Sequence, residues 1–188
     1  VREAKGRVDA YAQEALKKTT EESIADRKGM YDSQIDKILE RALGDHYLGT
    51  FMADEMPLVV QEYKNAGRPD RFGFVMNTDN SAGPGKHWTS VYVDGNSVEY
   101  YDSLGNAAPK ELVSGVADLV DEMNPDTLLK WKANRVVDQT TSWNCGWHAL
   151  RFLLQRFSGT PFREASRYNN VPAAEKAVIG LKKRFGYV

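Results

Sequence analysis

The sequence predicts an α+β fold in which helices pack on a small sheet. Two patterns carry this prediction. Short runs of aromatic and β-branched residues, separated by turn residues, occupy residues 72–103 and are typical of strands. Amphipathic and largely apolar segments with helical spacing occupy much of residues 109–185. The chain has 188 residues, 41% of them hydrophobic and 27% charged, so it is long and apolar enough to form a hydrophobic core.

The first 44 residues are expected to form a helical arm. They are rich in Ala, Glu, Lys and Asp, contain no proline and are interrupted only by single glycines, which predicts two or three helical pieces. The face best suited to packing on the rest of the chain consists of Met30, Ile35, Ile38, Leu39 and Leu43. We therefore divide the chain into an N-terminal helical arm, residues 1–44, and a second domain, residues 45–188. The arm is more typical of a packing appendage than of a recognition element.

The second domain begins with a segment that carries few strand or helix signals. Residues 45–57 are expected to form a loop or a short helical turn. An amphipathic helix is predicted around residues 58–63, and Gly67 and Pro69 end it because both residue types disfavour helix continuation. Three strands are predicted after it, at residues 72–78, 87–93 and 97–103.

The Asp94–Gly95 pair between the second and third predicted strands indicates a hairpin. Glycine tolerates the positive φ that tight hairpin turns need, so this dipeptide is a strong turn signal. His87 begins one of the two strands and Asp102 lies near the end of the other. These two side chains are therefore expected on neighbouring antiparallel strands.

The remaining segments are mainly helical. Residues 109–123 repeat their apolar side chains at helical spacing, and a short strand is predicted at residues 135–138. Residues 145–157 are apolar around most of the helix circumference, which predicts a central helix that is buried on several sides. Two more helical pieces are predicted at residues 162–168 and 173–185.

Charge and cysteine usage exclude several classes of protein. The formal net charge is −1, so no overall imbalance indicates a nucleic-acid or membrane partner. No apolar run is long enough to span a membrane, and the first residues lack the apolar core of a secretion signal, so we expect an intracellular protein that is not secreted. Cys145 is the only cysteine, which excludes an intrachain disulfide and a cysteine-rich zinc site. No metal and no cofactor are expected.

Cys145 stands where a polar loop meets the predicted central helix. The positive end of the helix dipole favours the thiolate there. A free thiol with a pKa of ~8.5 is only about 3% ionised at pH 7, and lowering that pKa by two units corresponds to ~2.7 kcal/mol. The dipole contributes ~0.3 to 1 kcal/mol. A reactive Cys145 therefore requires a histidine partner.

Three histidines are available for this role: His46, His87 and His148. His148 follows Cys145 by three positions on the same helix but has no obvious carboxylate to orient it. His46 is more typical of a surface or capping residue. We favour His87, because Asp102 on the neighbouring strand could hold its ring in the tautomer that pairs with sulfur.

An acyl-transfer enzyme also needs hydrogen-bond donors for the oxyanion of its tetrahedral intermediate, and such donors can contribute ~3 to 4 kcal/mol. Gln139 precedes Cys145 by six residues, so a loop that folds back could direct its amide N–H toward the point that the backbone N–H of Cys145 also reaches. The whole pattern is more specific than its parts. It consists of a His-Trp pair opening a strand, an Asp near the end of the next, a Gln, and Cys-Gly opening a buried helix.

This pattern resembles the adenovirus-type maturation cysteine protease (adenain) and its wider superfamily, which includes the proteases of SUMO and other ubiquitin-like proteins. The resemblance covers residues 47–157 and includes the segments YLGTF, VMNTDNSAGPGKHW, YYDSLG and QTTSWNCG. It implies a papain-like core with a small mixed sheet packed against the central buried helix. The source would be a DNA virus or a virus-like element.

The resemblance also implies a role for each residue of the pattern. Cys145 would be the nucleophile, His87 the general base and then acid, and Asp102 the carboxylate that orients the ring. Gln139 and the backbone amide of Cys145 would form the oxyanion hole. The residues expected to bind substrate are Trp88, Asn144 and Gly146, with the tryptophan shaping a narrow groove.

The function that the resemblance implies is cleavage of viral capsid or scaffold precursors at small-residue, Gly-Gly-like sites, in the virion or in the infected cell. The alternative is an isopeptidase that removes ubiquitin or a ubiquitin-like modifier, which the DSLG segment and the arm favour. A non-catalytic binding module is disfavoured by the complete set of polar groups. Adenain is assisted by a peptide linked through a second cysteine and by DNA. The single cysteine excludes that disulfide, and the near-neutral charge gives a DNA activator little support.

Overall fold

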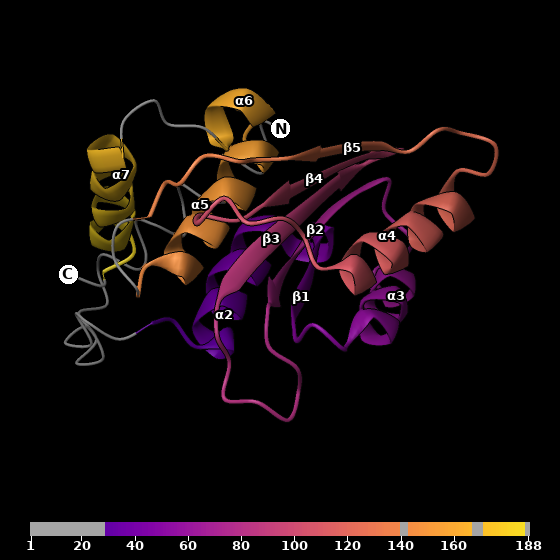
Figure 1. Cartoon of the computed structure of the whole chain (residues 1–188), viewed down its shortest axis with the longest axis horizontal. Coiled ribbons are helices and arrows are strands. Elements are labelled where there is room, and N and C mark those ends of the chain that lie inside the picture. Colours follow the sequence, from indigo (N-terminus) through magenta and orange to yellow (C-terminus); the bar gives the residue numbers. More distant parts are fainter. Residues whose placement is uncertain (1–28, 140–142, 167–170, 187–188) are drawn as a thin grey trace.

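The computed structural model describes residues 29–139, 143–166 and 171–186, so most of the predicted arm, residues 1–28, lies outside the described part. A five-stranded mixed sheet forms the centre of the fold, in the spatial order β1-β2-β3-β4-β5 (Figure 1). The outer pairs β1–β2 and β4–β5 are parallel, and β2–β3 and β3–β4 are antiparallel. The strands are β1 Tyr47–Phe51, β2 Arg71–Asn77, β3 Trp88–Asp94, β4 Ser97–Tyr101 and β5 Lys130–Ala133.

Helices cover both faces of this sheet (Figure 1). One face packs on α2, α5 and α7, and the other packs on α3 and α4. The α+β fold class predicted from the sequence is therefore confirmed. The helices are α2 Asp32–Leu43, α3 Met56–Asn65, α4 Lys110–Met123, α5 Cys145–Phe157, α6 Phe162–Ala165 and α7 Val171–Arg184, with a 3-10 turn, η2, at Gly44–His46.

The central helix α5 has the bounds that the sequence predicts and packs directly on the sheet. Gly73 of β2 makes this approach possible, because a Cβ there would lie 2.8 Å from a methyl group of Leu153 and 3.2 Å from the ring of Phe157. Most of α5 is buried, which explains why apolar residues surround it. The helix thus presents its N-terminus, where Cys145 stands, at a defined position relative to β3.

Helix α2 belongs to the same hydrophobic cluster as α5. The apolar face expected to pack on the rest of the chain is buried, and its five residues are Met30, Ile35, Ile38, Leu39 and Leu43. The division of the chain at residues 44 and 45 stays a prediction.

Two strand predictions are wrong. Residues 45–57 contain the edge strand β1 in addition to a helical turn, and the strand signal is weak because Gly49 adopts φ +123° and the pairing with β2 shifts between Tyr47 and Thr50. The last strand lies at Lys130–Ala133 and not at residues 135–138. Its partner β4 ends at Tyr101, so residues 135–138, which include the β-branched Val136 and Val137, extend past the ladder.

The other elements agree with prediction within a few residues, apart from α6, which ends at Ala165. Gly95 adopts φ +57° in the turn between β3 and β4, as the hairpin requires. None of the helices in the described ranges has the length and apolar character of a membrane span. Within the same ranges, no group of three or more acidic, histidine or cysteine side chains is placed to hold a metal ion.

Candidate active site

The β3–β4 hairpin brings His87 and Asp102 together. His87 directly precedes β3, Asp102 directly follows β4, and the imidazole Nε2 lies 2.6 Å from the carboxylate Oδ1. The Asp102 side chain is 1% exposed, and its Oδ1 also accepts the backbone N–H of Leu104 at 2.8 Å. Burial raises the pKa of the Asp102 carboxyl, but hydrogen bonding and attraction to His87 outweigh burial and lower it. The structure thus places His87 and Asp102 in contact, as the hairpin predicts, and their catalytic roles stay a prediction.

Cys145 interacts with the His87 ring. Burial raises the pKa of the thiol, but a hydrogen bond with His87 and backbone hydrogen bonds from Trp88 and Gly146 outweigh it, so the pKa falls below its ordinary value. Burial lowers the pKa of His87, whereas its hydrogen bonds to Asp102 and Cys145 raise it to about 9. Both shifts favour a thiolate beside an imidazolium at neutral pH.

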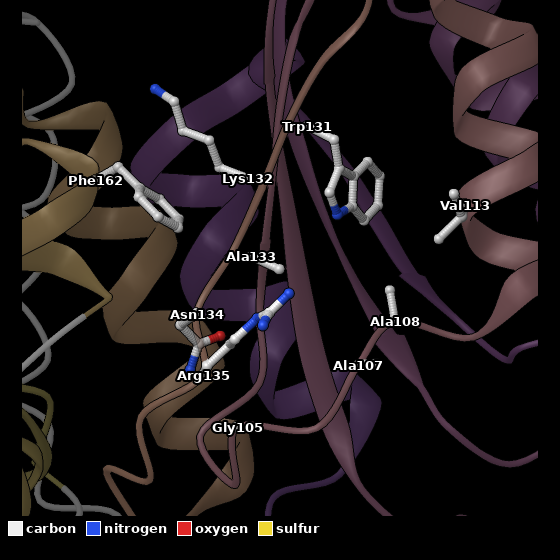
Figure 2. A pocket seen from close by; sticks show the side chains of 10 residues that line it. All are labelled: Gly105, Ala107, Ala108, Val113, Trp131, Lys132, Ala133, Asn134, Arg135 and Phe162. Atoms are coloured by element: carbon white, nitrogen blue, oxygen red, sulfur yellow. The ribbon is translucent and has the colours of Figure 1, made fainter.

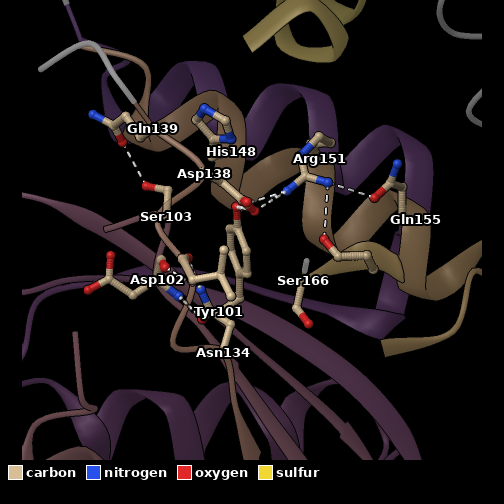
Figure 3. Close-up of polar contacts among 12 residues, drawn as sticks. Tyr101, Asp102, Ser103, Asn134, Asp138, Gln139, His148, Arg151, Gln155 and Ser166 are labelled. Atoms are coloured by element: carbon tan, nitrogen blue, oxygen red, sulfur yellow. Dashed lines mark hydrogen bonds and ion pairs between the residues drawn. The ribbon is translucent and has the colours of Figure 1, made fainter. Parts of the chain in front are cut away.

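Gln139 is held by the residue that follows Asp102. The Ser103 hydroxyl donates to Gln139 Oε1 at 2.6 Å, and the Gln139 backbone N–H donates to the Ser103 carbonyl at 3.1 Å (Figure 3). Because Oε1 faces Ser103, the amide nitrogen forms the end of the side chain turned away from Ser103. Gln139 is therefore connected to the His87–Asp102 pair by one residue, Ser103, which follows Asp102 in the chain.

A groove of about 560 Å³ opens at Cys145. Met30 and Trp88 line it on the side of α2 and β3, and the loop that ends at Lys86 lines it elsewhere. The Trp88 indole donates its N–H to the Met30 carbonyl at 2.9 Å, which fixes the ring. A Cβ at Gly146 would lie 3.0 Å from the Met30 Cβ and 3.3 Å from the Trp88 ring, so this position accepts only glycine without displacement.

Residues 68–185 match the protein family described as the Ulp1 protease family, C-terminal catalytic domain. The chain belongs to this family. This family is related to the superfamily of adenain and the proteases of ubiquitin-like proteins, which the sequence pattern resembles. The fold observed here is the papain-like α+β fold of this family. The narrower adenain-type assignment stays a prediction.

The chain is similar to proteases of African swine fever virus. The cysteine protease S273R of African swine fever virus (isolate Tick/Malawi/Lil 20-1/1983) is 30% identical over 108 residues, which cover 54% of this chain and 40% of that protein. The "SUMO-1 cysteine protease S273R" of the isolate Tick/South Africa/Pretoriuskop Pr4/1996 is 30% identical over the same length. The chain thus spans about 40% of the length of these curated relatives.

Solved structures agree on the fold. The crystal structure of the African swine fever virus pS273R protease aligns with a TM-score of 0.61 at 18% identity, covering 86% of this chain and 66% of that one. The C-terminal Ulp1 protease domain in complex with Smt3, the yeast ortholog of SUMO, aligns with a TM-score of 0.57 at 15% identity, covering 96% and 92%.

The two other histidines have partners other than Cys145. His46 Nδ1 lies 2.7 Å from the Arg71 carbonyl oxygen. His148 is fully buried, and burial lowers its pKa. The expectation that His148 has no carboxylate nearby is wrong, since its Nε2 lies 3.6 Å from Glu175 of α7. No local pattern connects two residues on helices so far apart in the sequence.

Asn144 is a predicted substrate-binding residue, and its side chain contacts helix α7. Its amide nitrogen donates to Glu175 Oε2 at 2.8 Å, while its backbone carbonyl accepts the His148 N–H at 3.0 Å. These contacts anchor the start of α5. Binding of substrate by Asn144 stays a prediction.

Asn134 is a supporting residue that sequence reasoning missed. Its side-chain oxygen accepts the backbone N–H of Asp102 at 2.8 Å, and its amide nitrogen donates to the Asp102 carbonyl at 2.6 Å (Figure 3). The backbone of the orienting carboxylate is thereby held from both sides. A lone Asn that follows an edge strand carries no signal of such a role.

A buried polar network lies behind the Gln139 loop (Figure 3). The Tyr101 hydroxyl donates to Asp138 Oδ2 at 2.8 Å and accepts from Arg151 at 2.8 Å. The Arg151 guanidinium lies 3.5 Å from the same carboxylate, and both side chains are at most 3% exposed. The network ties α5 to the residue that precedes Gln139.

We expect the substitution Asp138→Asn to lower the free energy of unfolding by about 3 kcal/mol, because it removes the carboxylate that a buried guanidinium pairs with. Urea unfolding followed by circular dichroism measures this change. The double variant Asp138→Asn/Arg151→Met should recover part of the loss, since no buried charge is then left. A single-variant loss below about 1 kcal/mol would show that the pair is not a buried charge contact.

A second cavity lies apart from the candidate cysteine, along the edge of β5 (Figure 2). Its volume is about 740 Å³. Trp131 and Val113 lie on one side of the strand, and Lys132 and Phe162 lie on the other. None of the candidate catalytic residues lines it, so the groove at Cys145 is the cavity that belongs to the chemistry.

Proposed function

We propose that this protein is a cysteine protease that cleaves after the C-terminal glycines of a SUMO-type modifier, acting as an isopeptidase. The observation that carries the proposal is an imidazole that lies 2.6 Å from the Asp102 carboxylate and interacts with Cys145, which lines a groove. Two of the similar proteins support the substrate, since one is named a SUMO-1 cysteine protease and another is solved with a SUMO ortholog.

The catalytic roles follow from this arrangement. The Cys145 thiolate attacks the scissile carbonyl carbon, and the Gln139 amide and the Cys145 backbone N–H donate to the oxyanion that forms. His87 then gives its proton to the leaving amine, which breaks the C–N bond and leaves a thioester on Cys145. Water, deprotonated by His87, hydrolyses the thioester, and Asp102 holds the ring in orientation throughout.

The walls of the groove support a preference for glycine before the scissile bond. Trp88 and Met30 meet above Gly146, where even a methyl group would lie 3.0 Å from its nearest neighbour. Met30, Trp88 and Cys145 line the same groove, so we infer that a substrate residue bound beside Cys145 has a small side chain. The terminal Gly-Gly of ubiquitin-like modifiers meets that condition.

The experiment that tests the proposal treats the full chain with a panel of modifier probes that carry a C-terminal electrophile. We expect the SUMO-type probe to label Cys145 faster than the ubiquitin probe, and the Cys145→Ala variant to remain unlabelled. Absence of labelling by every modifier probe would refute the isopeptidase proposal.

A second candidate function is processing of viral precursor proteins, which the similarity to a viral cysteine protease favours. It would act in the virion or in the infected cell and would use the same residues on unfolded Gly-Gly segments. Cleavage of Gly-Gly peptides and candidate precursors, mapped by mass spectrometry, without labelling by modifier probes would support it. The two functions therefore separate in a single set of assays.

A further inference from the structure

Ser103 occupies a position that joins the two halves of the candidate site. Its neighbour Asp102 contacts His87, while its own hydroxyl contacts the Gln139 amide at 2.6 Å. Its backbone carbonyl accepts the N–H groups of both Asp138 and Gln139, at 2.8 and 3.1 Å. The side chain is almost fully buried, so this hydroxyl is removed from competition with water.

The Ser103 hydroxyl selects one orientation of the Gln139 amide. A hydroxyl that donates to Oε1 turns the amide nitrogen, which is the donating end, away from Ser103. An oxyanion hole requires a donor that is already oriented before the charge develops, because reorientation during the reaction costs free energy. This hydrogen bond restrains rotation about the last torsion of the Gln139 side chain, which is otherwise broad for an amide.

The backbone that carries Gln139 is held independently of the Ser103 hydroxyl, because its contact with Ser103 is made by the Ser103 backbone carbonyl. The Asp138 carboxylate receives a hydrogen bond from Tyr101 and lies 3.5 Å from the Arg151 guanidinium. The Tyr101 ring stacks on Phe152 of α5, with ring centroids 4.8 Å apart. Loss of the Ser103 hydroxyl should therefore weaken the preference of the Gln139 amide for this orientation without displacing its backbone.

We propose that Ser103 is a positioning residue that orients the Gln139 side chain as an oxyanion donor. This inference rests on the proposed cysteine protease function. It assigns Ser103 no contact with the substrate. Its effect on the reaction passes through Gln139, which is the property that the experiment tests.

The test is a double-mutant cycle on hydrolysis of a fluorogenic SUMO-type substrate by the full chain. Removal of the donor in Gln139→Ala should lower kcat about 100-fold, and Ser103→Ala should lower kcat about tenfold with KM nearly unchanged. In the Gln139→Ala background, Ser103→Ala should change kcat by less than about twofold, since it has no donor left to orient.

Alkylation of Cys145 by chloroacetamide separates a positioning role from a purely structural one. If Ser103 only supported the fold, its loss would also change the alkylation rate. This displacement reaction needs the thiolate but forms no tetrahedral oxyanion, so its rate and pH profile should be the same in Ser103→Ala and in the unchanged protein. The matched control is Ser90→Ala, which removes an equally buried hydroxyl in β3 whose oxygen has no hydrogen-bond partner among the described residues. It should leave kcat unchanged.

Several results would overturn the inference. They are an unchanged kcat in Ser103→Ala while Gln139→Ala is impaired, losses that multiply in the double variant, or an alkylation rate that falls together with kcat. Each of these leaves the protease function standing. Hydrolysis that persists in Cys145→Ala would instead refute the proposed function itself.

Discussion

Replacement of Cys145 by alanine is expected to abolish hydrolysis, with a loss in kcat on the order of 10⁴- to 10⁶-fold, as for removal of other enzyme nucleophiles. The sulfur is the atom that forms the covalent bond, and no other thiol exists in the chain. In the proposed mechanism the imidazole of His87 transfers protons, so it does not replace the sulfur as nucleophile.

The fold should survive this substitution. Cys145 is 6% exposed at the start of α5. Alanine has a higher helix propensity than cysteine and keeps the contacts of the Cβ atom. Hydrolysis of a fluorogenic modifier substrate measures the activity, and thermal unfolding followed by circular dichroism verifies the fold. Turnover by folded Cys145→Ala within about tenfold of the unchanged protein would exclude Cys145 as the nucleophile.

Replacement of His87 by alanine is expected to lower kcat/KM by on the order of 10³-fold or more, because it removes both the base and the charge that stabilises the thiolate. Without His87, burial still raises the pKa of the Cys145 thiol, and the backbone hydrogen bonds from Trp88 and Gly146 remain to lower it. The thiol pKa should therefore rise.

The pH profile of alkylation tests the sign of this effect. In the unchanged protein, thiolate forms as pH rises through the lowered pKa of Cys145, and the imidazolium persists until pH approaches about 9, the pKa of His87. In His87→Ala, the midpoint of the chloroacetamide reaction should move to higher pH. The control is His46→Ala, since His46 contacts Arg71 and not Cys145. A midpoint that stays in place would disprove the ion pair.

The central part of the site could be predicted because its signals are local. Asp94 and Gly95 specify a tight turn, so the pairing of the two strands that flank it follows, and His87 and Asp102 meet. The placement of Cys145 at a helix N-terminus follows from the change between a polar loop and a continuous apolar segment.

The supporting contacts could not be predicted in this way. Ser103 and Gln139 are separated by 36 positions, and Asn144 and Glu175 by 31, with no repeating pattern between them. Hydrogen bonds of this kind depend on the packing of α5 and α7 and on the path of the chain after β5. The strand β1 was missed for a related reason, since parallel pairing is set by a distant partner and Gly49 obscures the local pattern.

Local chemistry in the amino-acid sequence was thus sufficient to specify the α+β class, the hairpin and the central helix. Turns and amphipathic periodicities depend on residues a few positions apart, so they can be deduced without coordinates. The tertiary structure decided which histidine meets Cys145, what orients Gln139 and where the groove lies. These features depend on side chains that only the folding of distant segments brings within hydrogen-bond distance, and the pKa values of the reactive pair follow from that proximity.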